Sequence, residues 1–285
     1  MQFLVASSKV LLSLALTTLL LACANTTRSG AVGVNRSQFL AVSASEVDRL
    51  SAISYNDQNQ KAKEKNILIT SGPAYDRLKT ISTRLIAQTG VFRDDTQQWN
   101  WQLVLINAPI LNATCAPGGK ITFYTGLIEQ LNLTDDEIAA IMGHEIAHAL
   151  REHGRERLSQ AMAQSAVANI AMAVAGPYGS AVSAANQAAQ YVLVLPNSRQ
   201  NESEADAIGL ELAARAGYNP KAAISVWQKM NKATEGKGTF EFLSTHPSGD
   251  TRIEQLTELM PAVEPLYIAS AKNAGSKHNT EKIKN

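Results

Sequence analysis

The chain has 285 residues, of which 45% are hydrophobic and 18% are charged, and its formal net charge is +1. This composition is typical of a globular protein with a substantial core and excludes a disordered chain. The charge is near zero and no basic stripe alternates with aromatic residues, so nucleic acid is not an expected partner.

Residues 1–22 are predicted to be a signal peptide. Lys9 precedes an apolar run from Val10 to Ala22, which is shorter than the roughly 20 residues of a membrane span. Residues 20–23 (Leu-Leu-Ala-Cys) resemble a bacterial lipobox, in which cleavage leaves an acylated cysteine at Cys23. A plain signal peptide with an incidental cysteine is the alternative. Because Ala24 rather than an aspartate follows Cys23, the resemblance implies a lipoprotein of the outer membrane that faces the periplasm.

Only two cysteines are present, Cys23 and Cys115. If Cys23 carries lipid, Cys115 has no partner, so no internal disulfide is expected. A catalytic Cys115 nucleophile is one reading of this residue. A small buried hydrophobe is the other, and a single cysteine in a strand-like segment favours it.

The folded body is predicted to span residues 45–270. Residues 23–44 are rich in Ser, Thr, Gly and Asn and suit a flexible tether, and residues 271–285 form a polar C-terminal tail. The pattern predicts helices at 46–65 and 74–88, then short strands at 99–106, 112–115 and 120–124. Helices and strands are therefore segregated, which indicates an α+β domain with more helix than sheet.

A further helix is predicted after residues 134–137 (Thr-Asp-Asp-Glu), which form a capping box. Its apolar face is made of Ile138, Ile141, Met142, Ile146 and Ala149. A helix with a defined start and a buried stripe can hold functional side chains rigidly.

Residues 144–148 (His-Glu-Ile-Ala-His) form an HExxH pattern on this helix. Residues four apart share one helix face, so the imidazoles of His144 and His148 can bind one metal ion. Glu145 is offset by about 100° from His144, which places its carboxylate beside the metal as a general base. The pattern also arises by chance on solvated helices. The spacing nevertheless predicts the site of a zinc peptidase.

Residues 161–195 are rich in alanine and are interrupted at Gly176, Pro177 and Gly179. Several Asn and Gln residues and the short halves of this stretch argue against a membrane hairpin. We expect two helices of small residues, which form either a lid, part of the substrate cleft, or simply core.

A catalytic zinc ion needs a third protein ligand and leaves a fourth position open. Glu202 and Asp206 are four residues apart at the start of another predicted helix. One carboxylate is expected to bind zinc while the other accepts a hydrogen bond from a ligand histidine. Acidic residues also favour helix N-termini for electrostatic reasons, and Glu204 is a rival ligand.

Four segments together resemble family forty-eight of the zinc metallopeptidases, which contains CAAX prenyl endopeptidases, HtpX-type heat-shock membrane proteases and Oma-type mitochondrial proteases. Residues 112–121 resemble the family's N-A-x-x-x-P-G-G-x-I stretch, and the HExxH pattern follows. Glu202, Ala205 and Asp206 match E-x-x-A-D, and residues 246–253 match H-P-x-x-x-x-R-I. The small bacterial periplasmic lipoproteins are the subgroup that the chain resembles most.

This resemblance implies a mainly helical zincin-type (gluzincin) domain with a small β-sheet, one Zn²⁺ per chain, and Glu202 as the third ligand. It also implies that His246 and Arg252 lie near the metal. Either side chain is expected to stabilise negative charge on the scissile carbonyl oxygen. His246 has an alternative role as a fourth zinc ligand that silences the enzyme.

The strand before the zinc helix is our candidate for substrate binding, through Asn112, Ala113, Gly118 and Gly119. Edge strands bind extended peptides through main-chain hydrogen bonds. A plain structural hairpin is the alternative, because Pro-Gly-Gly is ordinary turn chemistry.

The resulting expectation is a zinc metalloendopeptidase in the periplasm, tethered to the outer membrane by lipid. Its substrates would be misfolded or unassembled envelope proteins, and the outer-membrane assembly machinery is a further possible partner. A chaperone-like assembly factor with latent protease activity is the alternative. A structural lipoprotein with a vestigial site is disfavoured, because every expected zinc ligand is present.

Overall fold

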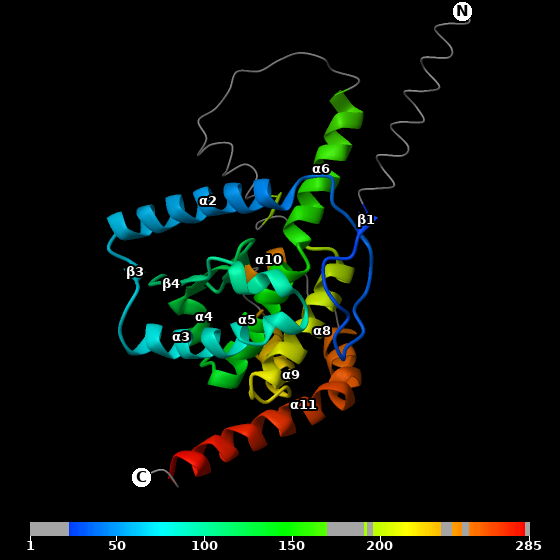
Figure 1. Ribbon diagram of the computed structural model, residues 1–285. Helices are drawn as coiled ribbons and strands as arrows, with labels where there is room; N and C mark the ends of the chain where they lie inside the picture. The colour runs from blue at the N-terminus through cyan, green and yellow to red at the C-terminus, as the bar shows by residue number, and fades with distance from the viewer. Residues whose placement is uncertain (1–22, 170–190, 193–195, 235–240, 247–250, 283–285) are drawn as a thin grey trace, which may run out of the picture.

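The computed structural model describes residues 23–169, 191–192, 196–234, 241–246 and 251–282 (Figure 1). The predicted signal peptide, residues 1–22, lies outside these residues, as does most of the alanine-rich stretch 161–195. Among the described residues, no helix has both the length and the hydrophobicity that crossing a membrane requires.

Helices make up most of the described chain, as predicted for an α+β domain with more helix than sheet. The helices are α2 (Ala44–Glu64), α3 (Pro73–Ile86), α4 (Thr125–Gln130), α5 (Asp135–Leu150), α6 (His153–Asn169), α8 (Arg199–Arg215), α9 (Ala222–Thr234), α10 (Glu241–Thr245) and α11 (Thr251–Lys282). The strands are β1 (Cys23–Ala24), β2 (Gln38–Phe39), β3 (Leu68–Ile69), β4 (Gln102–Ile106), β5 (Ala113–Ala116) and β6 (Lys120–Tyr124). Two 3₁₀ helices, η1 (Thr89–Val91) and η2 (Asp94–Gln98), precede β4.

The main sheet has four strands in the order β3-β4-β6-β5. The central pair β4 and β6 is parallel, and the outer pairs are antiparallel. The expected strand at 99–106 begins only at Gln102, because the Trp101 backbone N–H donates to the nearby Trp99 carbonyl oxygen at 2.9 Å and not to a neighbouring strand. The strand order places β5, which precedes β6 along the chain, at an edge of the sheet.

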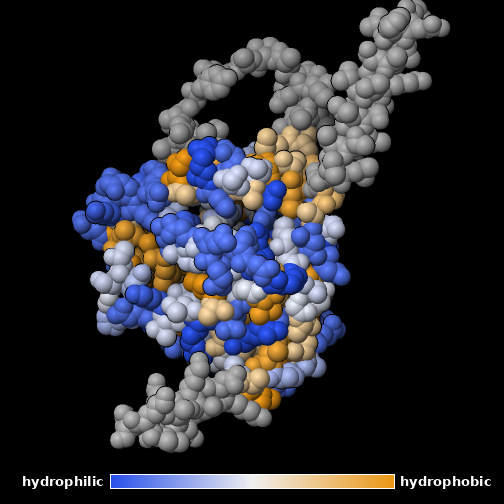
Figure 2. All heavy atoms as spheres, viewed as in Figure 1, coloured by the Kyte–Doolittle hydropathy of each residue, from blue (hydrophilic) through white to orange (hydrophobic). Residues whose placement is uncertain are grey.

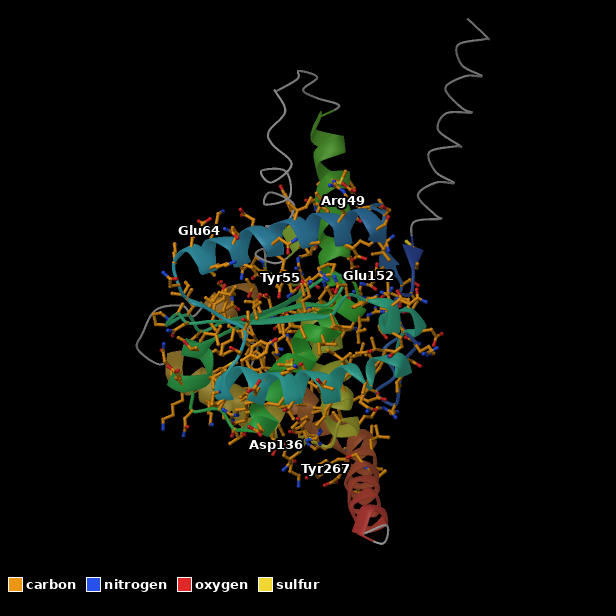
Figure 3. All side chains as sticks on the ribbon, turned by 60° about the vertical axis from the view of Figure 1, so that its left-hand side comes forward. Arg49, Tyr55, Glu64, Asp136, Glu152 and Tyr267 are labelled. Atoms are coloured by element: carbon orange, nitrogen blue, oxygen red, sulfur yellow. The ribbon has the colours of Figure 1, made fainter. Side chains whose placement is uncertain are left out.

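Helices cover both faces of this sheet. Helix α2 lies across one face, while α3 and α5 lie on the other (Figure 3). Asp136 and Glu152 mark the two ends of the α5 region, which passes through the interior of the domain (Figure 3). The central position of α5 brings its side chains close to β5 and to the helices that follow.

The start of α5 is the predicted capping box. The Thr134 hydroxyl accepts from the Glu137 N–H at 3.3 Å, and the Glu137 carboxylate accepts from the Thr134 N–H at 2.9 Å. Ile138, Met142 and Ile146 on the predicted apolar face are completely buried. Burial of the apolar face, together with the cap, holds the HExxH segment in place.

Helices α5 and α8 cross in close backbone contact at Gly143 and Gly209. A Cβ atom placed on Gly209 would lie 2.6 Å from the His144 backbone nitrogen, and one on Gly143 would lie 2.8 Å from the Gly209 carbonyl oxygen. Only glycine leaves room for this approach. The crossing brings the first turn of α8, with its carboxylates, beside the histidines of α5.

Residues 24–42 are an ordered part of the domain and not the flexible tether that their composition predicts. β1 pairs with β2, and Arg28 forms an ion pair with Asp94 at 2.8 Å. Gln38 is 1% exposed, and its amide donates to the Arg151 carbonyl oxygen. These polar contacts, together with the partly buried Val32 and Val34 and the buried Leu40, hold the segment against the domain.

The C-terminal helix α11 continues past the expected domain boundary at residue 270 and ends at Lys282. The polar tail 271–285 is therefore helical over most of its length. Pro261 and Pro265 lie inside this helix. Figure 1 shows its last turns extending away from the body of the domain.

Residues 161–169 of the alanine-rich stretch belong to α6, which rises out of the domain (Figure 1). Figure 2 shows hydrophobic atoms where this helix leaves a surface that is otherwise largely hydrophilic. Met162 on it is 55% exposed. The expectations of a lid or a core pair of helices concern residues 170–190 and 193–195, outside the described residues.

Candidate active site

Four side chains from three parts of the chain form one buried cluster. His144 and His148 come from α5, Glu202 from the first turn of α8, and His246 from the residue after α10. One ligand atom of each lies within 4.8 Å of those of the other three, and all four side chains are buried. The structure thus brings together the three predicted zinc ligands and adds a third imidazole.

The spacing of these ligand atoms fits a tetrahedral zinc site. Zinc bonds of roughly 2.0–2.2 Å place tetrahedral ligands about 3.3 Å apart. His144 Nε2 lies 3.0 Å from His148 Nε2 and 3.2 Å from His246 Nδ1. Glu202 lies 3.4 Å from the Nε2 atoms of His144 and His148 and 3.1 Å from His246 Nδ1. Imidazole and carboxylate are also the donors that zinc favours.

Asp206, the expected partner of a ligand histidine, contacts His144. Its Oδ1 lies 3.0 Å from His144 Nδ1, on the side of the ring away from the cluster. A ring that binds metal through Nε2 carries its proton on Nδ1 and donates it to such a carboxylate. Asp206 thereby orients the His144 ring.

Arg252 lies near the metal cluster, but its guanidinium faces carboxylates and not the substrate side. It donates to Glu202 at 2.8 Å and to both oxygens of Asp206 at 2.7 and 2.6 Å. Its guanidinium carbon lies 3.6 Å above the ring of Trp227. Because three of its five N–H donors are engaged by carboxylates, the geometry favours a positioning role for Arg252 over the expected role in stabilising a carbonyl oxygen. Arg252 instead positions Glu202 and Asp206.

His246 occupies the fourth corner of the cluster. Its Nδ1 faces the other ligand atoms, and its Nε2 lies 3.4 Å from Glu145 Oε1. Phe242 stacks on the ring with the centroids 4.4 Å apart. Of the two expected roles, this geometry favours the fourth zinc ligand.

Glu145 is placed for general-base chemistry. It is 3% exposed, and its Oε1 has no hydrogen-bond partner in the structure. The backbone N–H of Cys115, in the edge strand β5, donates a hydrogen bond to the Glu145 carboxylate. Burial raises the pKa of Glu145 above its ordinary value, which makes the carboxylate a stronger base.

A polar network behind His148 was not expected from the sequence. His153 Nδ1 lies 2.8 Å from His148 Nδ1, and His153 Nε2 lies 3.1 Å from Glu204 Oε2. If His148 binds metal through Nε2, its Nδ1–H donates to His153, and His153 donates in turn to Glu204. Glu204, which the sequence offered as a rival zinc ligand, therefore does not join the metal cluster. It holds His153, and His153 holds the ligand His148.

The N-terminal segment completes this network. Arg36 donates to Glu204 at 2.5 Å and to Glu156 at 2.5 Å. Arg151, which is fully buried, donates to Glu204 at 2.9 Å. Burial by itself would raise the pKa of Glu204, but hydrogen bonds from His153 and Arg36 outweigh it and lower the pKa to about 2. Nothing in the sequence pattern links Arg36 to residue 204, since 168 positions separate them.

Of the residues expected to bind substrate, Asn112 directly precedes β5, Ala113 begins it, and Gly118 and Gly119 lie in the turn that follows it. Ala113 is completely buried in the core, and Asn112 accepts from the Ala113 N–H. Gly118 and Gly119 adopt positive φ angles of 73° and 79° and lie against Asp48 and Trp101. These glycines build the β5–β6 turn, so direct substrate contact is left to the edge of β5.

The Cys115 side chain lies in β5 and is 4% exposed. Burial raises the pKa of its thiol, which stays protonated at neutral pH. The buried reading of Cys115 is therefore correct, and the nucleophile reading is not supported.

Comparisons with known proteins agree with this geometry. The model of Peptidase family M48 matches residues 74–260. The mitochondrial metalloendopeptidase OMA1 of Arabidopsis thaliana is 36% identical over 176 residues, which are 62% of this chain and 35% of that protein. OMA1 of Schizosaccharomyces pombe is 30% identical over 231 residues, which are 81% of this chain and 66% of that protein.

A bacterial protein is also similar. The beta-barrel assembly-enhancing protease of Escherichia coli strain K12 is 27% identical over 187 residues, which are 60% of this chain and 38% of that protein. The chain thus spans between 35% and 66% of the length of these relatives. The family match includes the HExxH helix, Glu202, His246 and Arg252. The chain therefore belongs to Peptidase family M48, has a zincin-like domain and carries a cluster of residues that fits a zinc ion.

Proposed function

We propose that the chain is a zinc metalloprotease that acts in the periplasm, tethered to the outer membrane by lipid on Cys23, and hydrolyses misfolded or unassembled envelope proteins. The similarity to a beta-barrel assembly-enhancing protease supports this substrate class. The lipobox-like residues 20–23 support the location. Cys23 is exposed, as an acylated residue must be.

The reaction rests on the buried cluster and Glu145. When bound, zinc supplies a Lewis acid that polarises a carbonyl and lowers the pKa of water. His144, His148 and Glu202 are the residues that hold it, with Asp206 and His153 orienting the rings. Glu145 accepts a proton and passes it to the leaving amine. Because β5 is an edge strand, its main-chain groups that face away from β6 can pair with an extended substrate, which suits a protease with unfolded clients.

Metal analysis and digestion of an unfolded protein test the activity. Purified mature protein should contain about one zinc per chain and digest an unfolded outer-membrane protein, and a chelator should abolish digestion. Folded substrate is the control and should remain intact. Digestion that is unaffected by complete removal of zinc would contradict the zinc mechanism.

Fractionation tests the location. In a bacterial host, the wild type should be labelled with palmitate and sediment with outer membranes. Cys23→Ser should lose the label and become soluble in the periplasm, whereas Cys115→Ser should keep both properties. Outer-membrane recovery of the Cys23→Ser protein would argue against a lipid anchor.

A second candidate, a chaperone-like assembly factor with latent proteolysis, is favoured by the position of His246. With this ring at the fourth corner, the metal site is closed to substrate. Removing the ring by His246→Ala should raise basal proteolysis several-fold if the resting enzyme is latent. Full rescue of envelope assembly by a Glu145→Gln protein would identify client binding, and not cleavage, as the main role.

A further inference from the structure

A cavity of about 20 Å³ lies between the edge strand and the metal cluster. Its lining includes Thr114, Pro117, Glu145, Arg157, Asn197 and His246. A peptide that extends β5 past Glu145 would run along the mouth of this cavity, which itself has room for only about one small polar group. The polar groups that line it are therefore placed to contact substrate.

Arg157, from α6, brings a positive charge to this lining. Its Nε donates to the Tyr191 carbonyl oxygen at 2.8 Å, and one terminal nitrogen, Nη2, donates to the Val192 carbonyl oxygen. The other terminal nitrogen, Nη1, is buried and has no hydrogen-bond partner among the residues that the structure describes. The observed hydrogen bonds of Arg157 therefore go to neutral carbonyl oxygens. Within the described residues its guanidinium forms no ion pair with a carboxylate.

A buried N–H donor without a partner is energetically costly, and Nη1 is such a donor on a side chain that is otherwise partly exposed. Burial lowers the pKa of Arg157 to about 10, so the group remains charged at neutral pH. An anion that reaches Nη1 would relieve this cost and form a charge-assisted hydrogen bond.

Asn197 lines the same cavity and carries a second unpartnered atom. Its side-chain nitrogen donates to the Thr245 carbonyl oxygen at 3.4 Å, and its backbone N–H donates to the same oxygen. This contact orients the amide, because a reversed amide would face the carbonyl with its own oxygen. Oδ1 of Asn197 is consequently left buried and free to accept.

We propose that Arg157 and Asn197 form a subsite for an acidic substrate residue beside the scissile bond. Arg157 Nη1 donates to the substrate carboxylate, and Asn197 Oδ1 accepts from a substrate main-chain N–H. The enzyme then favours unfolded segments that carry Asp or Glu next to the cut. This subsite rests on the protease activity of the chain and adds a preference that the zinc cluster itself does not provide.

Two zinc-binding peptides that differ only in charge test the subsite without requiring turnover. The probes are acetyl-Ala-Glu-hydroxamate and acetyl-Ala-Gln-hydroxamate, which have nearly the same shape. Titration calorimetry on the zinc-loaded protein should give at least about tenfold tighter binding of the Glu probe, as expected for one charge-assisted hydrogen bond. Arg157→Gln should reduce this ratio to about one, and Arg157→Lys should retain most of it.

Arg49→Gln is the matched control, because Arg49 is an exposed arginine on α2 that pairs with Glu46. It should show the wild-type ratio. Zinc content and thermal unfolding of Arg157→Gln report whether the variant is folded. Equal binding of the two probes, or a ratio that survives in Arg157→Gln, would each overturn the subsite. If His246 keeps both probes out of the wild type, the same titration on His246→Ala, in which the fourth corner is open, decides it.

Cleavage-site mapping separates this inference from the activity. Wild type acting on denatured casein should show Asp and Glu enriched next to the cuts, and Arg157→Gln should lose the enrichment. An active wild type without enrichment contradicts the subsite alone. A protein that cuts nothing contradicts the protease activity, while the probe titration still decides the subsite.

Discussion

Four of the five histidines in the chain lie in one place, at His144, His148, His153 and His246. Helical spacing predicts the first pair, and the resemblance to a family predicts the last. His153 escapes prediction because α5 ends at Leu150 and Glu152 adopts a positive φ of 51°. This turn directs His153 back onto His148, which regular helical spacing does not allow.

At this scale, Glu145→Gln tests the general base. The amide has nearly the same shape as the carboxylate but accepts no proton, so activity on unfolded protein should fall by about 10²–10⁴-fold. Bound zinc should stay near the wild-type amount, because Glu145 is not among the cluster ligands. Substantial residual activity would show that another group takes the proton.

At the scale of elements, the site depends on how α5 and α8 meet. Sequence periodicity predicts both helices and the buried face of α5. It does not predict their crossing, because side-chain spacing says nothing about which neighbour a helix will contact. The Gly143–Gly209 contact sets the distance between the helices, and with it the separation of Glu202 from His144 and His148.

Gly209→Ala should disturb this crossing. The added methyl group would lie 2.6 Å from the His144 backbone nitrogen, so we expect a loss of about 1–3 kcal/mol in unfolding free energy and weaker zinc binding. Denaturant unfolding and chelator competition measure the two effects. Gly90→Ala is the control, since its methyl would meet only Gln97 at 3.7 Å. Unchanged zinc affinity in Gly209→Ala would refute this role of the crossing.

The capping box of α5 predicts a pH dependence. Burial alone would raise the pKa of Glu137, but bonds from Lys229, the Thr134 N–H and Ser225 outweigh it and lower the pKa below 4.5. A lowered folded-state pKa stabilises the protein above the unfolded pKa, and this contribution is lost as pH falls through the folded value. Glu137→Gln should therefore cost about 1–2 kcal/mol at pH 7 and much less at pH 3.

Denaturant unfolding at the two pH values measures this change. Glu129→Gln, at an exposed position on α4, is the control and should be neutral at both. An equal loss at pH 7 and pH 3 would show that the charge of Glu137 is not what stabilises the helix start.

For the whole molecule, the N-terminal segment is part of the catalytic domain. Its Arg36 donates to Glu204. Its Asn25 side chain and Arg36 carbonyl oxygen accept from Arg151 at the end of α5, which also donates to Glu204. Glu204 in turn holds His153 against the ligand His148. The residues that follow a lipid-modified Cys23 would thus be joined to the metal site by a continuous chain of hydrogen bonds. Composition cannot predict this, because the segment is polar and its partners lie far along the sequence.

Arg36→Ala tests the connection. Partners that orient metal ligands typically change metal affinity by about 10–100-fold, so we expect a weakening of about tenfold or more by chelator competition. Arg36→Lys should recover part of the loss. Arg28→Ala, which removes an exposed ion pair with Asp94, is the matched control. Wild-type zinc affinity in Arg36→Ala would mean that the segment only packs against the domain.

The sequence alone determined the helix that carries the site, its capping box, two zinc ligands and the general base, because these depend on local spacing and propensity. Choosing Glu202 over Glu204 required the family resemblance, and the structure agrees with that choice. Tertiary structure decided that His246 occupies the fourth corner of the metal cluster and that Arg252 contacts carboxylates. It also decided the partners of Arg36 and Arg157. These contacts join residues that are distant in sequence, and only the packing of helices and strands brings such residues together.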